Sequence, residues 1–157
     1  MMERVLVLCE GNICRSPMAA ALLARAIDPI VVHSAGTNAL IGHGADPIAV
    51  DLMADRGIDI RAHRATQLEE WMATKADLVL VMERDQQRFI ERRFPSLVGR
   101  VYRLGDAMQR ASLPLGGFNV PDPYRRGREA FVETLKYIDD GVASWGRQIV
   151  SMVRAAC

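Results

Sequence analysis

Cys9 and Arg15 lie at the two ends of a short segment that directly follows the apolar run at residues 5–8. The five residues between them are enough to curl backbone N–H groups around one tetrahedral anion. A helix that opens at Ser16 and Pro17 would add its unpaired N–H groups and its dipole at the same point. These positive groups would also stabilise a thiolate, and an arginine fork binds two phosphoryl oxygens. The segment therefore predicts phosphoryl transfer onto the sulfur of Cys9.

The bare spacing of a cysteine and an arginine is a weak signal, because ordinary composition produces it by chance. In the other interpretation, Cys9 is an inert buried cysteine at the end of a core strand and Arg15 begins a solvated helix. The context favours the anion loop, since Ser16 suits an N-cap and Pro17 the first helical position. The predicted phosphate-binding residues are Glu10, Gly11, Asn12, Ile13, Cys14, Arg15 and Ser16.

A second chemical element lies in the long stretch at residues 105–127, which has no clear periodicity. Long loops of this kind in compact domains are usually functional or disordered. Pro121 and Pro123 stiffen the backbone around Asp122, and Tyr124 follows. One carboxyl group can protonate the leaving oxygen and then activate water, so Asp122 is the predicted general acid and base. Without Cys9 and Arg15, the same residues would be interpreted as a plain turn.

The elements that must position these residues alternate along the chain. Apolar runs predict strands at residues 5–8, 30–32, 78–82 and 101–104. Helices are predicted at residues 18–27, 47–56, 84–94 and about 128–155, with Asp46 as the cap of the second. Thr66 and Glu69 fit a capping box before a further short helix. The last helix carries an apolar stripe that predicts core packing: Phe131, Leu135, Ile138, Val142, Trp145, Ile149 and Met152.

This alternation predicts the α/β class, as a three-layer α/β/α open parallel sheet of four strands with helices on both faces. Ligands of such sheets bind beyond the carboxyl ends of the strands. Cys9 ends the first strand, while Glu83 and Gly105 follow the third and fourth. We therefore expect these residues and the loop that bears Asp122 to lie along one edge.

Composition restricts the remaining classes. The 157 residues are 50% hydrophobic and 25% charged, which predicts one globular domain over residues 1–157. A formal net charge of +1 gives no reason to expect nucleic acid or an anionic membrane as a partner. The absence of a long apolar stretch or a signal-peptide pattern, and three cysteines that cannot all pair, favour the cytoplasm. Because the three histidines are scattered, we expect no metal site. We also expect no other cofactor, and we expect a monomer.

The chain resembles the low-molecular-weight protein tyrosine phosphatases. The resemblance rests on the segment at residues 9–17, on Ser34-Ala35-Gly36-Thr37, on His63 and on Asp122-Pro123-Tyr124. It extends over nearly the whole chain. Residues 39–47 look most like the bacterial branch that is paired with tyrosine autokinases in exopolysaccharide export. The resemblance implies hydrolysis of phosphotyrosine through a phosphocysteine on Cys9, with a tyrosine kinase as a candidate substrate.

The resemblance also implies supporting roles. Asn12, Ser34 and His63 match the residues that hold the loop in shape, and Ser16 would donate a hydrogen bond to the Cys9 sulfur, cap the helix, or both. Ile13, Leu40 and Tyr124 would form a slot that favours a phenyl phosphate, whereas arginine-phosphatase members carry a small polar residue in place of Ile13. The chain departs from the family pattern at Leu40, Arg125 and Thr66.

Two competing functions are weaker. An arsenate reductase of similar fold would need further cysteines about seventy to eighty residues downstream, and that region has none. A catalytically idle phosphopeptide-binding module would not need Cys9, Arg15 and Asp122 together.

The roles of Cys14 and of the arginines after Tyr124 stay open. Cys14 either packs as a small apolar residue or protects Cys9 by a disulfide. Likewise, Arg125, Arg126 and Arg128 are either a solvated face or an attractant for acidic peptides.

Overall fold

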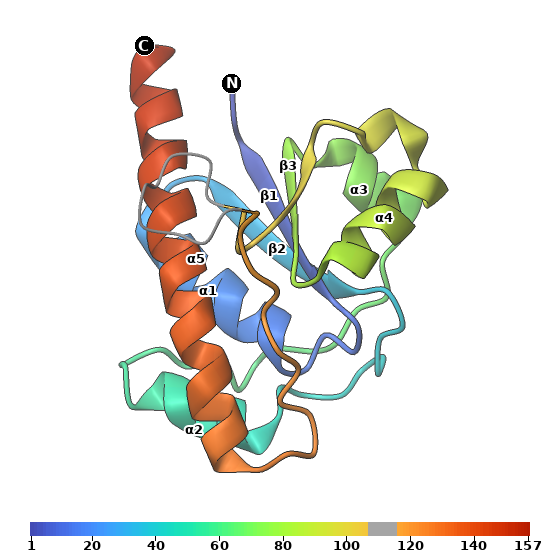
Figure 1. Cartoon of the computed structure of the whole chain (residues 1–157). Coiled ribbons are helices and arrows are strands. Elements are labelled where there is room, and N and C mark those ends of the chain that lie inside the picture. Colours follow the sequence, from blue (N-terminus) through green and yellow to red (C-terminus); the bar gives the residue numbers. More distant parts are fainter. Residues whose placement is uncertain (107–115) are drawn as a thin grey trace.

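A computed structural model describes residues 1–106 and 116–157 of the chain (Figure 1). Of the stretch predicted to be a long loop, residues 107–115 lie outside the described part. The strands are β1 (Arg4–Cys9), β2 (Val31–Gly36), β3 (Leu78–Val81) and β4 (Val101–Arg103). The helices are α1 (Arg15–Ile27), α2 (Pro47–Ala54), α3 (Glu70–Lys75), α4 (Arg84–Arg93), the 3₁₀ turn η1 (Pro95–Leu97) and α5 (Arg128–Ala155).

The four strands form one parallel sheet in the order β2-β1-β3-β4, with helices on both faces (Figure 1). Alternate residues of β1 serve the two sides. Val5 and Val7 belong to the core shared with α1, α2 and α5, whereas Leu6 and Leu8 belong to the core shared with α3 and α4. All four side chains are buried because β1 is a central strand with both faces covered. The predicted three-layer α/β architecture is confirmed.

The strand order places the predicted nucleophile at the switch point of the sheet. The chain passes from β1 to β2 on one side and then crosses to β3 on the other. Cys9 ends β1 and pairs with Gly36, the last residue of β2. Loops diverge at such a point, which leaves room for a ligand beyond the carboxyl ends of the strands.

β2 is longer than the predicted strand at residues 30–32 and continues through His33 and Ser34 to Gly36. The apolar run stops early because β2 is an edge strand, and its first four residues are only partly covered or exposed. Polar residues are tolerated there, so a criterion of continuous hydrophobicity missed the last four of the six residues of the strand.

The start of α1 differs from the prediction in a way that matters for the site. The helix begins at Arg15 with Cys14 as N-cap, and no side chain caps it. The interpretation of Ser16 as the helix cap is therefore wrong. Ser16 lies in the first turn and is fully buried, with its hydroxyl turned to Cys9 and Asn12.

The predicted capping box at Thr66 and Glu69 is also wrong. Helix α3 begins at Glu70, and the side chain of Glu69 makes no capping bond. The capping box that does form joins Glu83 and Gln86 at the start of α4. By contrast, Asp46 caps α2 as predicted, with its Oδ1 accepting from the Ile48 amide at 2.9 Å.

Helix α5 has the predicted bounds and buries its apolar stripe, except for Met152, which is 48% exposed. The C-terminal turns of α5 extend beyond the sheet (Figure 1), and Met152 lies in these turns. Within residues 1–106 and 116–157, no helix is both long enough and apolar enough to cross a bilayer.

Candidate active site

The loop between β1 and α1 turns its carbonyl groups outward. The carbonyl oxygens of Cys9, Glu10, Gly11 and Ile13 accept hydrogen bonds of 2.8–3.1 Å from the amides of Thr37, Asn38, Leu40 and Asp46. In a trans peptide the N–H group points opposite to the preceding C=O. The amides of the loop therefore face its centre, where they form a ring of donors suited to an anion.

Asn12 holds the loop in this shape. It adopts a left-handed backbone conformation, with φ of 57°, and is fully buried. Its Nδ2 donates to Ser16 Oγ at 2.7 Å and to Ser34 Oγ at 3.0 Å, and its Oδ1 accepts from the Thr66 amide at 2.9 Å. His63 contacts the main chain instead, with its Nε2 2.7 Å from the Asn12 carbonyl oxygen. Because a carbonyl only accepts, Nε2 carries the proton.

The Cys9 sulfur lies 2.9 Å from Ser16 Oγ. Ser16 Oγ already accepts from the amide group of Asn12, so its own hydrogen is free to point at the sulfur. A hydroxyl donor at this distance stabilises negative charge on sulfur, both in a thiolate nucleophile and in a thiolate leaving group.

Arg15 is a buried cation, only 2% exposed, at the edge of the loop. Its Nη1 donates to Glu83 Oε1 at 2.5 Å and to the Val120 carbonyl at 2.9 Å. Its Nη2 lies 3.6 Å from Asp122 Oδ2. These contacts fix the guanidinium plane and leave other N–H groups of the fork available to a ligand.

Asp122 reaches the same place from the far end of the sequence. Its side chain is 42% exposed, and its Oδ1 accepts from the Tyr124 amide at 3.1 Å. A cavity of about 240 Å³ is bounded by Cys9, Arg15 and Asp122 together. The structure thus brings the three predicted chemical groups around one space.

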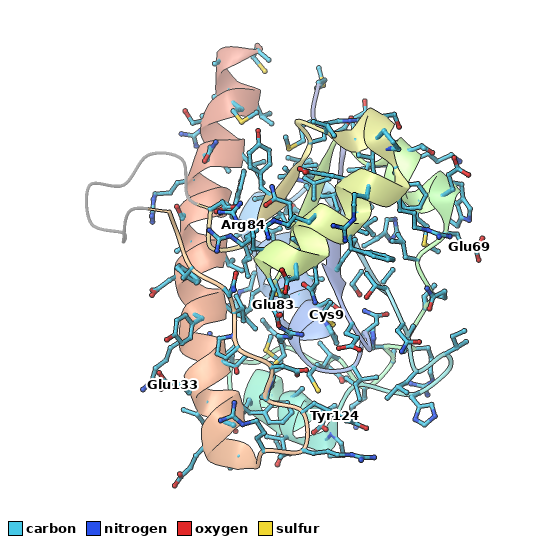
Figure 2. All side chains as sticks on the ribbon, turned by 45° about the vertical axis from the view of Figure 1, so that its right-hand side comes forward. Cys9, Glu69, Glu83, Arg84, Tyr124 and Glu133 are labelled. Carbon is cyan, nitrogen blue, oxygen red and sulfur yellow. The ribbon has the colours of Figure 1, made fainter. Side chains whose placement is uncertain are left out.

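The walls of this cavity include Ile13, Leu40 and Tyr124, the three residues predicted to form the slot. Ile13 is nearly buried, whereas Leu40 and Tyr124 are 37% and 39% exposed at the mouth. In Figure 2, Cys9, Glu83 and Tyr124 are labelled on three different segments that surround the site. An apolar-walled slot above a ring of amides matches an aryl phosphate in shape and polarity.

The arginines after Tyr124 do not form one cluster. Arg128 turns toward α2, with its guanidinium nitrogens 3.5 and 3.6 Å from the carboxylates of Asp51 and Asp55. Arg125 instead lies over the ring of Tyr124, with its Cζ 5.0 Å from the ring centroid. Of these two arginines, Arg125 lies next to the slot and Arg128 does not.

Sequence reasoning missed the roles of Glu83, Thr66 and Gln67 around the site. Glu83 pairs with Arg15, and its place between β3 and α4 was the only sequence signal. Thr66 supports Asn12 through its main chain, so the departure from the family pattern at this side chain leaves that contact intact. Gln67 bonds both Thr37 and Ala39, which braces the segment that carries Leu40.

The cysteines are all free thiols. Burial raises the pKa of the Cys14 thiol well above its ordinary value, and the negative charge of Asp46 raises it further. In the described part of the chain, no group of three or more His, Cys, Asp or Glu residues is arranged to hold a metal ion.

Known proteins resemble this chain in sequence and in fold. The family model for low molecular weight phosphotyrosine protein phosphatases matches residues 4–155. A probable low molecular weight protein-tyrosine-phosphatase EpsP of Ralstonia solanacearum is 48% identical over 145 residues, 92% of this chain and 94% of that protein. Low molecular weight protein-tyrosine-phosphatase Wzb of Escherichia coli K12 is 35% identical over 152 residues, 95% of this chain and 97% of its relative.

A solved structure of Vibrio vulnificus Wzb in complex with benzylphosphonate superposes with a TM-score of 0.85 and 32% identity. The match covers 94% of this chain and 99% of that one. Family model, sequence relatives and fold agree over nearly the full length. The chain therefore belongs to the low molecular weight protein-tyrosine-phosphatase family.

Proposed function

We propose that the chain hydrolyses phosphotyrosine in proteins through a phosphocysteine intermediate. The Cys9 thiolate attacks phosphorus, and the S–P bond forms as the P–O bond to the phenol breaks. Asp122 gives its proton to the departing oxygen. In the second step Asp122, now a base, takes a proton from the water that attacks phosphorus, and the Cys9 thiolate leaves.

The observation that carries this proposal is the convergence of Cys9, Arg15 and Asp122 on one cavity with apolar walls. The inward amides and Arg15 oppose the charge of the equatorial phosphoryl oxygens. Phosphoryl transfer has a loose transition state, so positioning and charge stabilisation supply most of the rate enhancement. The hydroxyl of Ser16 assists the thiolate as leaving group.

Phosphotyrosine is favoured over the shorter phosphoserine by the slot. Ile13, Leu40 and Tyr124 line the same cavity as Cys9, and their side chains offer apolar surface for an aromatic ring. We propose a phosphorylated bacterial tyrosine kinase of an exopolysaccharide system as the physiological substrate. The names EpsP and Wzb of the relatives support this choice. We further propose that the protein acts in the cytoplasm, as a monomer.

The Asp122→Asn substitution tests the acid. We expect kcat/KM for phenyl phosphate to fall by about 10²–10⁴-fold. The loss for nitrophenyl phosphate should be about tenfold or less, because nitrophenolate is a stable anion that needs little protonation. Glu129→Gln, which removes one exposed negative charge nearby, is the matched control and should leave both rates unchanged. Equal losses on the two substrates would show that Asp122 is not the acid.

The substrate is tested by trapping. Asp122→Ala protein keeps Cys9 and Arg15 but turns over slowly, so it should retain tyrosine-phosphorylated proteins from a lysate of the source cells. Recovery of a tyrosine kinase with a phosphorylated tail supports the exopolysaccharide proposal. Recovery of other phosphotyrosine proteins in its place would refute the kinase but not the phosphatase chemistry.

Cys14 is predicted to protect Cys9 from irreversible oxidation. Peroxide converts Cys9 to a sulfenic acid, and the Cys14 thiol condenses with it to a disulfide with loss of water. Both residues line the same cavity. We expect peroxide to inactivate the enzyme reversibly, and Cys14→Ser protein to recover far less activity after thiol reduction.

The raised pKa of Cys14 gives this capture a pH dependence. The attacking species is the thiolate, whose fraction keeps rising with pH up to a raised pKa. Recovery of the wild type should therefore increase steadily from pH 6 to about pH 9. Cys157→Ser protein, which lacks the exposed terminal thiol, should behave as the wild type. Full recovery of Cys14→Ser protein would exclude the protective role.

A further inference from the structure

Asn119 precedes residues 120–124, which carry Asp122 and are called the acid loop below, and it ties this loop to two other elements. Its Oδ1 accepts a hydrogen bond from Arg103 Nη1 at 2.9 Å and a second from the Arg84 amide at 3.0 Å. Arg103 ends β4, and Arg84 is the first residue of α4, beside Glu83 in Figure 2. One side-chain oxygen therefore joins the approach to Asp122 to the carboxyl edge of the sheet.

The main partner of Asn119 is rigid. Arg103 is only 5% exposed, and its guanidinium bonds Asp106 Oδ1 at 3.1 Å through Nε and at 2.7 Å through Nη2. The same guanidinium donates to the Gly116 carbonyl, and the indole of Trp145 donates to the Arg103 carbonyl at 3.2 Å. Because a buried cation is costly without partners, the bonds to Asp106, Gly116 and Asn119 hold the Arg103 guanidinium in one position.

The chain from Asn119 to Asp122 has little freedom to absorb a displacement. The Val120 amide donates to the Met82 carbonyl at 2.9 Å, and the Val120 carbonyl accepts from Arg15. Pro121 and Pro123 have restricted φ angles. The segment from Asn119 to Asp122 is therefore stiff, so the position of Asn119 at its start bears on the position of the Asp122 carboxylate at its end.

We propose that Asn119 is a positioning residue for the acid step. Held by Arg103 and by the Arg84 amide, it sets where Asp122 stands relative to the leaving oxygen above Cys9. This inference rests on the proposed role of Asp122 as general acid. Proton transfer needs hydrogen-bond distance between the acid and the leaving oxygen, and a misplacement of about 1 Å can cost about 10²-fold in rate.

Leaving-group dependence separates positioning from a structural role. In Asn119→Leu protein we expect kcat/KM for phenyl phosphate to fall by about 10–100-fold and that for nitrophenyl phosphate by less than about threefold. Asn119→Asp keeps the oxygen acceptor and should stay within about threefold of the wild type on both substrates. Asn119→Ala, which adds no apolar bulk, is the second variant and should behave as Asn119→Leu.

Gln87→Leu is the matched control. Gln87 lies on α4 and makes two comparable bonds, to the Val101 carbonyl at 2.8 Å and from Arg84 Nη1 at 2.6 Å. Neither bond involves the acid loop, so both rates should match the wild type. Equal losses on the two substrates in the Asn119 variants would overturn the inference, since a general loss of folded structure lowers both.

A double-mutant cycle with Asp122→Asn completes the test. If Asn119 acts through Asp122, adding Asn119→Leu to Asp122→Asn protein should lower kcat/KM for phenyl phosphate by less than about twofold further. A further loss as large as in the wild-type background would overturn the inference and leave the acid role of Asp122 intact. The proposed acid role itself fails separately, if Asp122→Asn alone affects both substrates equally.

Discussion

Replacement of Cys9 by serine is expected to lower kcat/KM for phenyl phosphate by at least about 10⁴-fold. A serine hydroxyl is not ionised at neutral pH, so the inward amides and the hydroxyl of Ser16 would have no thiolate to stabilise. The substitution is nearly isosteric at a site that is only 3% exposed. The fold and the binding of phosphate should therefore persist. Thermal unfolding, measured with and without phosphate, would show both.

Cys157→Ser is the matched control for this result. It makes the same chemical change at an exposed terminal thiol, and it should retain full activity. Substantial turnover by correctly folded Cys9→Ser protein would end the covalent mechanism. Mass spectrometry of acid-quenched wild type should meanwhile detect one phosphoryl group, which Cys9→Ser protein should lack.

Arg15 is expected to give the second largest effect. Arg15→Ala should lower kcat/KM by about 10³–10⁵-fold, the range found for arginines that stabilise phosphoryl transfer. Arg15→Lys keeps the charge but not the planar fork, and should still lose at least about 10²-fold. Glu83 would lose its partner, but its side chain is 36% exposed and stays hydrated, so the fold should survive.

The control for Arg15 is an arginine whose ion pair has no part in the site. Arg56 donates to both carboxylate oxygens of Asp139, at 2.5 and 2.7 Å. Arg56→Ala should leave kcat/KM unchanged and cost at most about 1 kcal/mol of unfolding free energy, as exposed pairs do. Activity of Arg15→Lys within tenfold of the wild type would mean that fork geometry is not required.

Local features of the site were predictable because they lie within a few residues of one another. Cys9 and Arg15 are the two ends of the short loop that joins β1 to α1, and the apolar residues of β1 come directly before it. The α/β class followed from apolar runs that alternate with helical segments. The location of the site, beyond the carboxyl ends of the strands, followed from that class. These arguments need only the order of residue types along the chain.

Local reasoning failed where a side chain had a stronger partner elsewhere. Ser16 suits a helix cap, but its hydroxyl lies between Cys9 and Asn12, and the helix begins one residue earlier. Thr66 suits a capping box, but its amide is taken by Asn12. In both cases a buried polar group of the loop needed a partner, and satisfying it outweighs the small gain from a cap.

The sequence by itself determined the class of fold, the family and the identity of the chemical groups. Tertiary structure alone decided which distant groups meet: Asn12 with Ser34, Arg15 with Glu83, and Asn119 with Arg103. A hydrogen bond requires two atoms to lie within about 3 Å. That condition depends on the path of all the intervening residues, which no local pattern of residue types records.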